Sequence, residues 1–132
     1  MDDLQIDHRL IQEILERDPR YHQRAYLFVL SALHYVISSL PQPRQVSARE
    51  LCAGGRDLAI ELFGPLARTV LESWGIHSTR DIGEIVFNLL ESEVLTKTEE
   101  ESLEDFIGVY DFKEVFEKQY PWGKLNRGIT RP

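Results

Sequence analysis

Four histidines and one cysteine are the side chains of this sequence best suited to hold a metal ion. Spacings such as HxxxH or CxxC allow two side chains to bind the same metal ion. No pair among these five residues has such a spacing. We therefore expect no metal and no other cofactor. We expect His34 to be a core histidine, at least half-buried, and the others to lie at helix ends or in loops. The residues are His8, His22, His34, His77 and Cys52.

Cys52 is also the obvious candidate nucleophile. A reactive cysteine needs a lowered pKa, and only Arg49 and Arg56 are nearby cations. Its place inside an expected helix favours a small buried hydrophobe instead. The chain has no GxSxG elbow, and Gly54-Gly55 follows a helix rather than a strand, so it is no phosphate loop. These patterns predict a protein that is not an enzyme.

Length and charge restrict the class of protein further. A chain of 132 residues with 42% hydrophobic residues predicts one domain with a substantial core. The net charge of −7 argues against nucleic acid and anionic membranes as partners. No stretch approaches the roughly 18 apolar residues that span a bilayer, and Met1-Asp2-Asp3 does not begin a signal peptide. We expect a cytoplasmic protein without a membrane segment.

The most organised stretch predicts a helix-turn-helix. Pro65 to Trp74 reads as one helix, and Gly75 fits a left-handed cap after it. Ser78 is a candidate N-cap for the next helix, with Asp81 three residues later. The second helix has an apolar stripe at helical spacing, formed by Ile82, Ile85, Val86, Leu89 and Leu90.

A short β-hairpin is expected to follow this second helix. Val94 to Thr98 can form one strand and Phe106 to Tyr110 the returning strand, with Gly108 at a bulge. An acidic loop without strands is the competing interpretation. With the hairpin, residues 65–110 form a winged-helix-like unit, and the fold class is mainly α (α+β) with five to six helices.

Four other helices complete the expected domain, which covers residues 1–120 and is followed by an irregular basic tail at 121–132. The segment Gln23 to Leu40 is apolar on most sides, which predicts a central buried helix. The pair Gly54-Gly55 indicates either a break or close packing on that central helix, and we favour packing. The others are Leu4 to Arg17, a helix capped by Ser47 with Glu50, and a last one capped by Asp111.

The second helix of the unit occupies the place of a DNA-reading helix, but its surroundings are acidic. From Ser78 to Tyr120 there are 12 acidic and 4 basic residues. Because binding to nucleic acid depends on neutralising phosphates, this sign argues against groove binding. We expect a protein-interaction or adaptor module with a basic protein partner, steered by charge. The candidate partner-binding residues are Glu84, Phe87, Glu91 and Glu99.

Phe87 is singled out because it lies far from the apolar stripe of its own helix. It either packs under the N-terminal helices or marks an exposed apolar contact for a partner. An alternative function is a nucleic-acid-associated regulator that uses the basic tail, through Lys124, Arg127 and Arg131. An enzyme with an unrecognised polar cleft is a third hypothesis.

Several strings of the sequence carry a resemblance to a known family. They are DPRYHQRAYLFVL, ELCAGGRDLAIELFGPLARTVLESWGI, STRDIGEIVFNLLESEVLTKTEE and YDFKEVF, and the most distinctive part is FGPLARTVLESWGI. They resemble an uncharacterised bacterial family of small single-domain proteins, over about Asp18 to Phe116. The resemblance implies a bacterial source and assigns no activity and no site residues.

Overall fold

The computed structural model describes residues 8–92, 95 and 102–118, and within them the chain is mainly helical without a β-strand. None of the helices described has the length and apolar character needed to cross a membrane. Short helical turns connect or follow the helices at Gly64–Leu66 (η1), Leu103–Phe106 (η2) and Glu114–Lys118 (η3). The α-helices are α1 (His8–Arg17), α2 (Gln23–Ser38), α3 (Ala48–Phe63), α4 (Ala67–Ser73) and α5 (Thr79–Glu91).

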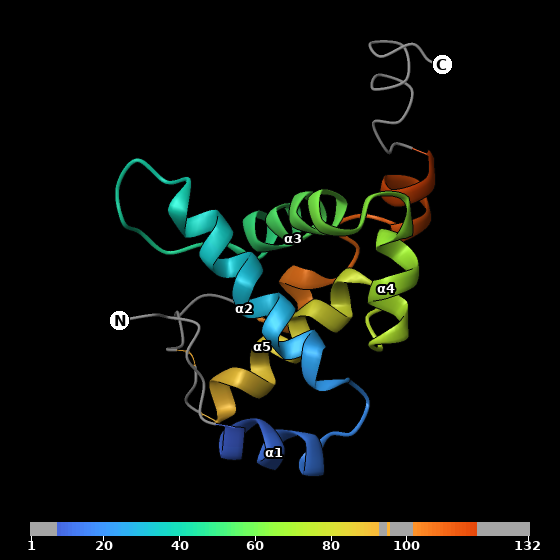
Figure 1. The fold of residues 1–132 in the computed structure, drawn as a ribbon. Coiled ribbons are helices and arrows are strands. Elements are labelled where there is room, and N and C mark those ends of the chain that lie inside the picture. The colour runs from blue at the N-terminus through green and yellow to red at the C-terminus, as the bar shows by residue number, and fades with distance from the viewer. Residues whose placement is uncertain (1–7, 93–94, 96–101, 119–132) are drawn as a thin grey trace.

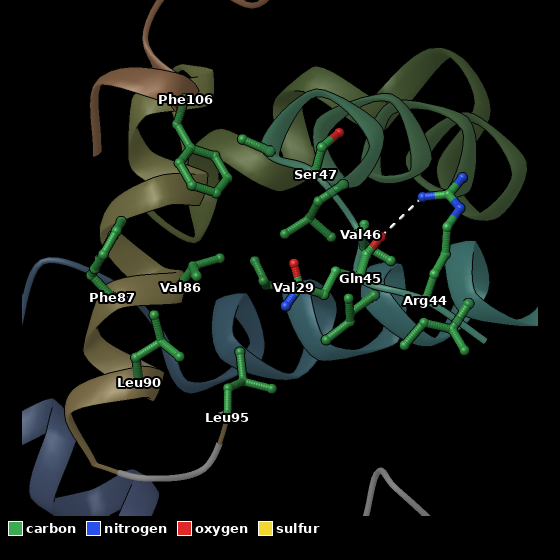
Figure 2. A pocket seen from close by; sticks show the side chains of 14 residues that line it. Val29, Arg44, Gln45, Val46, Ser47, Val86, Phe87, Leu90, Leu95 and Phe106 are labelled. Carbon is green, nitrogen blue, oxygen red and sulfur yellow. Dashed lines mark hydrogen bonds between the residues drawn. The ribbon is translucent and has the colours of Figure 1, made fainter. Parts of the chain in front are cut away.

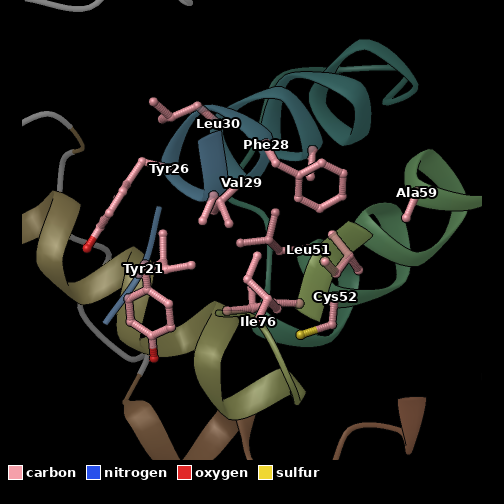
Figure 3. Packing of buried hydrophobic residues seen from close by; sticks show 14 of the residues in the cluster. Tyr21, Tyr26, Phe28, Val29, Leu30, Leu51, Cys52, Ala59 and Ile76 are labelled. Carbon is pink, nitrogen blue, oxygen red and sulfur yellow. The ribbon is translucent and has the colours of Figure 1, made fainter. Parts of the chain in front are cut away.

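Helices α2 and α5 lie in the middle of the molecule, with α1 on one side and α3 and α4 on the other (Figure 1). Apolar side chains from α2, α3 and the α4–α5 turn fill the space between them (Figure 3). The expected central helix is therefore confirmed. It is not buried all round, because Leu27, Tyr35 and Ile37 lie on an exposed side of α2.

The glycine pair of α3 lets this helix pack closely on α2, as the sequence predicted. A Cβ atom added at Gly54 would lie 2.2 Å from Cγ2 of Val36. A Cβ atom at Gly55 would instead meet Ala32 and Phe28 at 3.9 Å, which is ordinary contact. The close approach of the two helices therefore depends on Gly54. The helix begins at the expected capping box, in which Ser47 and Glu50 each accept a hydrogen bond from the other's backbone N–H.

The helix-turn-helix is confirmed as α4, a turn at Gly75 and α5. Gly75 has a φ of 98°, and a Cβ atom there would lie 2.4 Å from the carbonyl oxygen of Arg20. The Ile76 amide donates to the Leu71 carbonyl at 2.9 Å, which closes the end of α4. The N-cap of α5 lies at Ser78 as expected, although its side chain makes no capping hydrogen bond. Asp81 accepts a hydrogen bond from the His77 amide instead.

The prediction that Phe106 to Tyr110 form the returning strand of a wing is wrong. Phe106 ends the helical turn η2, and Ile107 and Gly108 form a turn rather than an extended strand. A capping box between Ser102 and Asp105 begins η2. Phe106 holds η2 against α5. Its side chain is 2% exposed and packs on Gly83, where an added Cβ atom would lie 2.7 Å from the ring. The first expected strand, apart from Leu95, lies outside the described residues.

Asp111 caps the last helical segment of the described chain, as the sequence predicted. Oδ1 of Asp111 accepts hydrogen bonds from the backbone amides of Lys113 and Glu114, at 2.8 and 3.2 Å. Phe112, Val115 and Phe116 are buried. The start of the first expected helix, before His8, and the basic tail at 121–132 lie outside the described residues.

Candidate binding pocket

Several polar side chains of α5 make contacts with other parts of the chain. Glu84 is in ion pairs with Arg20, at 3.3 Å, and with Arg80 on its own helix, at 3.4 Å. Arg20 also holds both carboxylate oxygens of Asp18, at 2.8 and 2.6 Å. Glu84 is therefore a link between α5 and the α1–α2 turn.

The C-terminal half of α5 is tied to α1 in the same way. The side-chain amide of Asn88 donates to Oδ2 of Asp18 at 2.9 Å and to the Tyr26 hydroxyl at 3.0 Å. Arg17 at the end of α1 donates to the Ser92 hydroxyl at 3.2 Å and lies 3.5 Å from the Glu91 carboxylate. Glu91 remains exposed, but its charge is partly balanced within the chain.

The start of α5 completes this polar network. The Tyr21 hydroxyl donates to Oδ1 of Asp81 at 2.6 Å. Burial and the neighbouring Asp81 carboxylate raise the pKa of Tyr21 far above its usual value. Three arginines and four carboxylates thus lie together on α5 and in the α1–α2 region, so part of the acidic charge of α5 is balanced within the described residues. The charged residues are Arg17, Arg20, Arg80, Asp18, Asp81, Glu84 and Glu91.

The remaining expected partner-binding residues, Phe87 and Glu99, have different outcomes. Phe87 is half-buried, and its ring meets the edge of Phe106 with centroids 6.4 Å apart. It packs on the C-terminal segment rather than under the N-terminal helices, and it also lines the pocket described below, so its contact with a partner stays a prediction. Glu99 lies outside the described residues. The three described members of the set all lie on α5, where Glu84 and Phe87 are half-buried and Glu91 is exposed, and their use by a partner stays a prediction.

An apolar pocket lies where α2 and α5 meet the loop between α2 and α3. Its volume is about 180 Å³. Figure 2 shows α5 side chains facing the loop across the pocket. The walls are formed by Val29, Leu33 and Ile37 of α2, by Arg44, Gln45, Val46, Ser47, Ala48 and Leu51 of the loop and α3, by Val86, Phe87 and Leu90 of α5, and by Leu95 and Phe106.

Arg44 provides the positive edge of this pocket. It donates to Oε1 and Oε2 of Glu50 at 3.0 and 2.7 Å, and to the Gln45 carbonyl oxygen at 2.9 Å. Arg44 and the Ser47 amide stabilise the charged Glu50 carboxylate and lower its pKa to about 2. The Arg44 side chain is still 52% exposed, so its guanidinium remains accessible to a second acceptor.

The histidines and Cys52 do not form a second site in the part of the chain that the structure describes. No group of three His, Cys, Asp or Glu side chains there could hold a metal ion. The expectation of a core histidine is wrong for His34, which is exposed on the open side of α2. Cys52 is fully buried, as expected, and burial raises the pKa of its thiol to about 12.

A second apolar surface lies across α2, α3 and α4. Leu62 and Leu66 are 57% and 60% exposed, and Leu27 lies beside half-buried Phe63 and Trp74 in a shallow groove. The groove is more open than the pocket between α2 and α5. Its apolar residues serve as controls for the pocket between α2 and α5, because they have the same chemical character but lie elsewhere on the molecule.

Comparison with known proteins adds no constraint on the site. No family model, curated protein or solved structure matches this chain. The resemblance to an uncharacterised bacterial family therefore stays a prediction, and function has to be argued from the pocket.

Proposed function

We propose that this protein is a non-enzymatic protein-interaction module that takes one apolar side chain of a partner into the pocket between α2 and α5. The observation that carries the proposal is the size of the pocket. Drug-sized ligands and cofactors occupy roughly 300–1,000 Å³, whereas a cavity of about 150 Å³ can take a molecule as small as benzene. A pocket of about 180 Å³ fits a leucine or phenylalanine side chain.

The chemistry of the walls supports binding over catalysis. The lining contains no carboxylate, histidine or cysteine among the described residues, and Arg44 is its one ionisable side chain. General acid–base catalysis needs a group that can exchange a proton near neutral pH. An arginine stays protonated there, so it can hold an anion but not exchange protons.

The energetics support an anchor rather than a complete interface. Burying one leucine or phenylalanine side chain contributes about 1.5–3 kcal/mol. A dissociation constant of 1 μM requires about 8 kcal/mol. The pocket therefore selects an apolar residue, and the partner must make further contacts around it. Half-buried Val86, Phe87 and Leu90 would lose their remaining exposure on binding.

Selection from a random peptide library displayed on phage tests the proposal. We expect the selected peptides to share one apolar residue. The variant Leu90→Phe adds a ring to the pocket wall and should weaken their binding at least tenfold. Leu62→Phe, the same change on the distant groove, should not alter it. Circular dichroism and urea unfolding verify that both variants fold.

Val46→Phe fills the same pocket from the loop and serves if Leu90→Phe does not fold. Peptides that share no apolar residue would contradict the proposal. So would equal affinity for the pocket-filling variants and for Leu62→Phe. A library that yields no binding peptide would also count against it.

A further inference from the structure

We infer that the partner's apolar anchor is accompanied by a carboxylate, which Arg44 receives at the edge of the pocket. This inference rests on the proposed function, because it concerns the occupant of the same pocket. It names a more specific partner, an acidic peptide with an apolar anchor. The expected partner in the sequence-based hypothesis was instead a basic protein.

The guanidinium of Arg44 has N–H groups that could bind a carboxylate of the partner. A guanidinium has five N–H groups in a fixed plane. Its hydrogen bonds to Glu50 and to the Gln45 carbonyl use three of them within the described residues. Among the described residues, the Nε hydrogen and one hydrogen on the second terminal nitrogen have no acceptor. Arg44 lines the pocket from the loop, on the side opposite α5 (Figure 2), so an incoming acceptor would extend from the anchor across the rim of the pocket.

The charges around Arg44 at the start of α3 also favour a carboxylate. Ser47 and Ala48 of the pocket wall stand at the N-terminal end of α3, where the helix dipole is positive. Arg49 follows in the first turn and is exposed. Glu50 offsets one of these charges, and no carboxylate lines the pocket among the residues described. Among the described residues, Arg44, Arg49 and Glu50 together give this edge a charge of +1, although the whole chain has a net charge of −7.

A double-mutant cycle between Arg44 and the peptide tests the inference. Selected peptides are compared with versions in which each Asp or Glu is replaced by Asn or Gln. With the wild-type protein, one such replacement should weaken binding about 1.5- to fivefold, as for an exposed or partly exposed ion pair. With Arg44→Gln, the same replacement should have almost no effect.

Two controls separate this effect from a general loss of charge or fold. Arg24→Gln removes an exposed cation on α2 that lies in the distant groove, and it should preserve discrimination between the two peptides. Arg44→Lys keeps the charge without the planar fork, and it should discriminate better than Arg44→Gln. Raising the salt concentration from 20 to 500 mM should reduce the discrimination by the wild type.

Equal discrimination by the wild type and by Arg44→Gln would overturn the inference, and so would selected peptides that carry no acidic residue. Neither result would contradict the proposed function if the same peptides still lose affinity for Leu90→Phe. Failure of the pocket-filling variants to weaken binding would overturn both.

Discussion

The side-chain amide of Asn88 donates a 2.9 Å hydrogen bond to Oδ2 of Asp18, a residue 70 positions earlier in the chain. The contact ties the polar side of α5 to the α1–α2 turn. The same amide also reaches the hydroxyl of fully buried Tyr26. A helix that would face DNA in a winged helix therefore has its polar side joined to the protein's own N-terminal region.

Replacing Asn88 with alanine should destabilise the protein by about 1–3 kcal/mol, because the Tyr26 hydroxyl and the Asp18 carboxylate each lose a donor. Urea unfolding measures the change. Gln12→Ala removes an exposed amide from α1 and should change the free energy of unfolding by less than about 0.5 kcal/mol. Equal values for the two variants would mean that the network contributes nothing to stability.

The Asp18 carboxylate should make stability depend on pH in the acid range. Hydrogen bonds from Arg20 hold its pKa far below the usual value. An unfolded aspartate has a pKa of about 3.9. The stabilisation is therefore fully present above about pH 4 and is lost as the pH falls towards the lower folded pKa. Urea unfolding between pH 6 and 2.5 should show a shallower acid loss for Asp18→Asn than for the wild type. Parallel curves would contradict this assignment.

Two neighbouring glycines in α3 should respond in opposite directions to the same substitution. Gly54→Ala should cost about 1–3 kcal/mol, because its Cβ atom would clash with Val36, 2.2 Å away. Gly55→Ala should stabilise the protein by about 0.5–1 kcal/mol, because its Cβ atom meets only ordinary contacts and alanine favours the helix. Thermal and urea unfolding measure both changes.

The double variant Gly54→Ala with Val36→Ala tests whether that clash is the cause. Removing Cγ2 of Val36 should make the Gly54→Ala substitution less costly than it is in the wild type. An unchanged cost in the two backgrounds would assign the effect to the backbone of α3 instead.

Cys52 should resist thiol reagents in the folded protein. It is fully buried, and burial raises the pKa of its thiol to about 12, so the reactive thiolate is scarce at neutral pH. Ellman's reagent at pH 8 should react with it at least a hundredfold faster in 6 M urea than in buffer. Rapid labelling of the native protein would place Cys52 at an accessible site and reopen a chemical role for it.

Local signals in the sequence were sufficient for much of the helical framework. Ser47 with Glu50 marks the start of α3, and Gly75 marks the turn before α5, because caps and left-handed positions depend on neighbouring residues. The same reasoning could have corrected the wing. Ser102 and Asp105 have the spacing of a capping box, whereas the apolar residues from Phe106 onward had suggested a strand.

The surroundings of α5 could not be read from the sequence, because they depend on contacts between distant segments. The polar residues of α5 look solvent-facing in a helical projection. Their partners Arg17, Asp18 and Arg20 come from 64 to 75 positions away. The pocket likewise combines walls from separate elements. Phe87 was the one lining residue that the sequence had predicted as a partner contact, from its position away from the apolar stripe of its helix.

Intermolecular NOEs between a selected peptide and the methyl groups of the protein test the central claim most directly. The account predicts NOEs from the peptide's apolar anchor to Val46, Val86 and Leu90 around the pocket, and their disappearance with Leu90→Phe. NOEs from that anchor to Leu27 and Leu62 in the groove between α2 and α3, with none at the pocket, would contradict it.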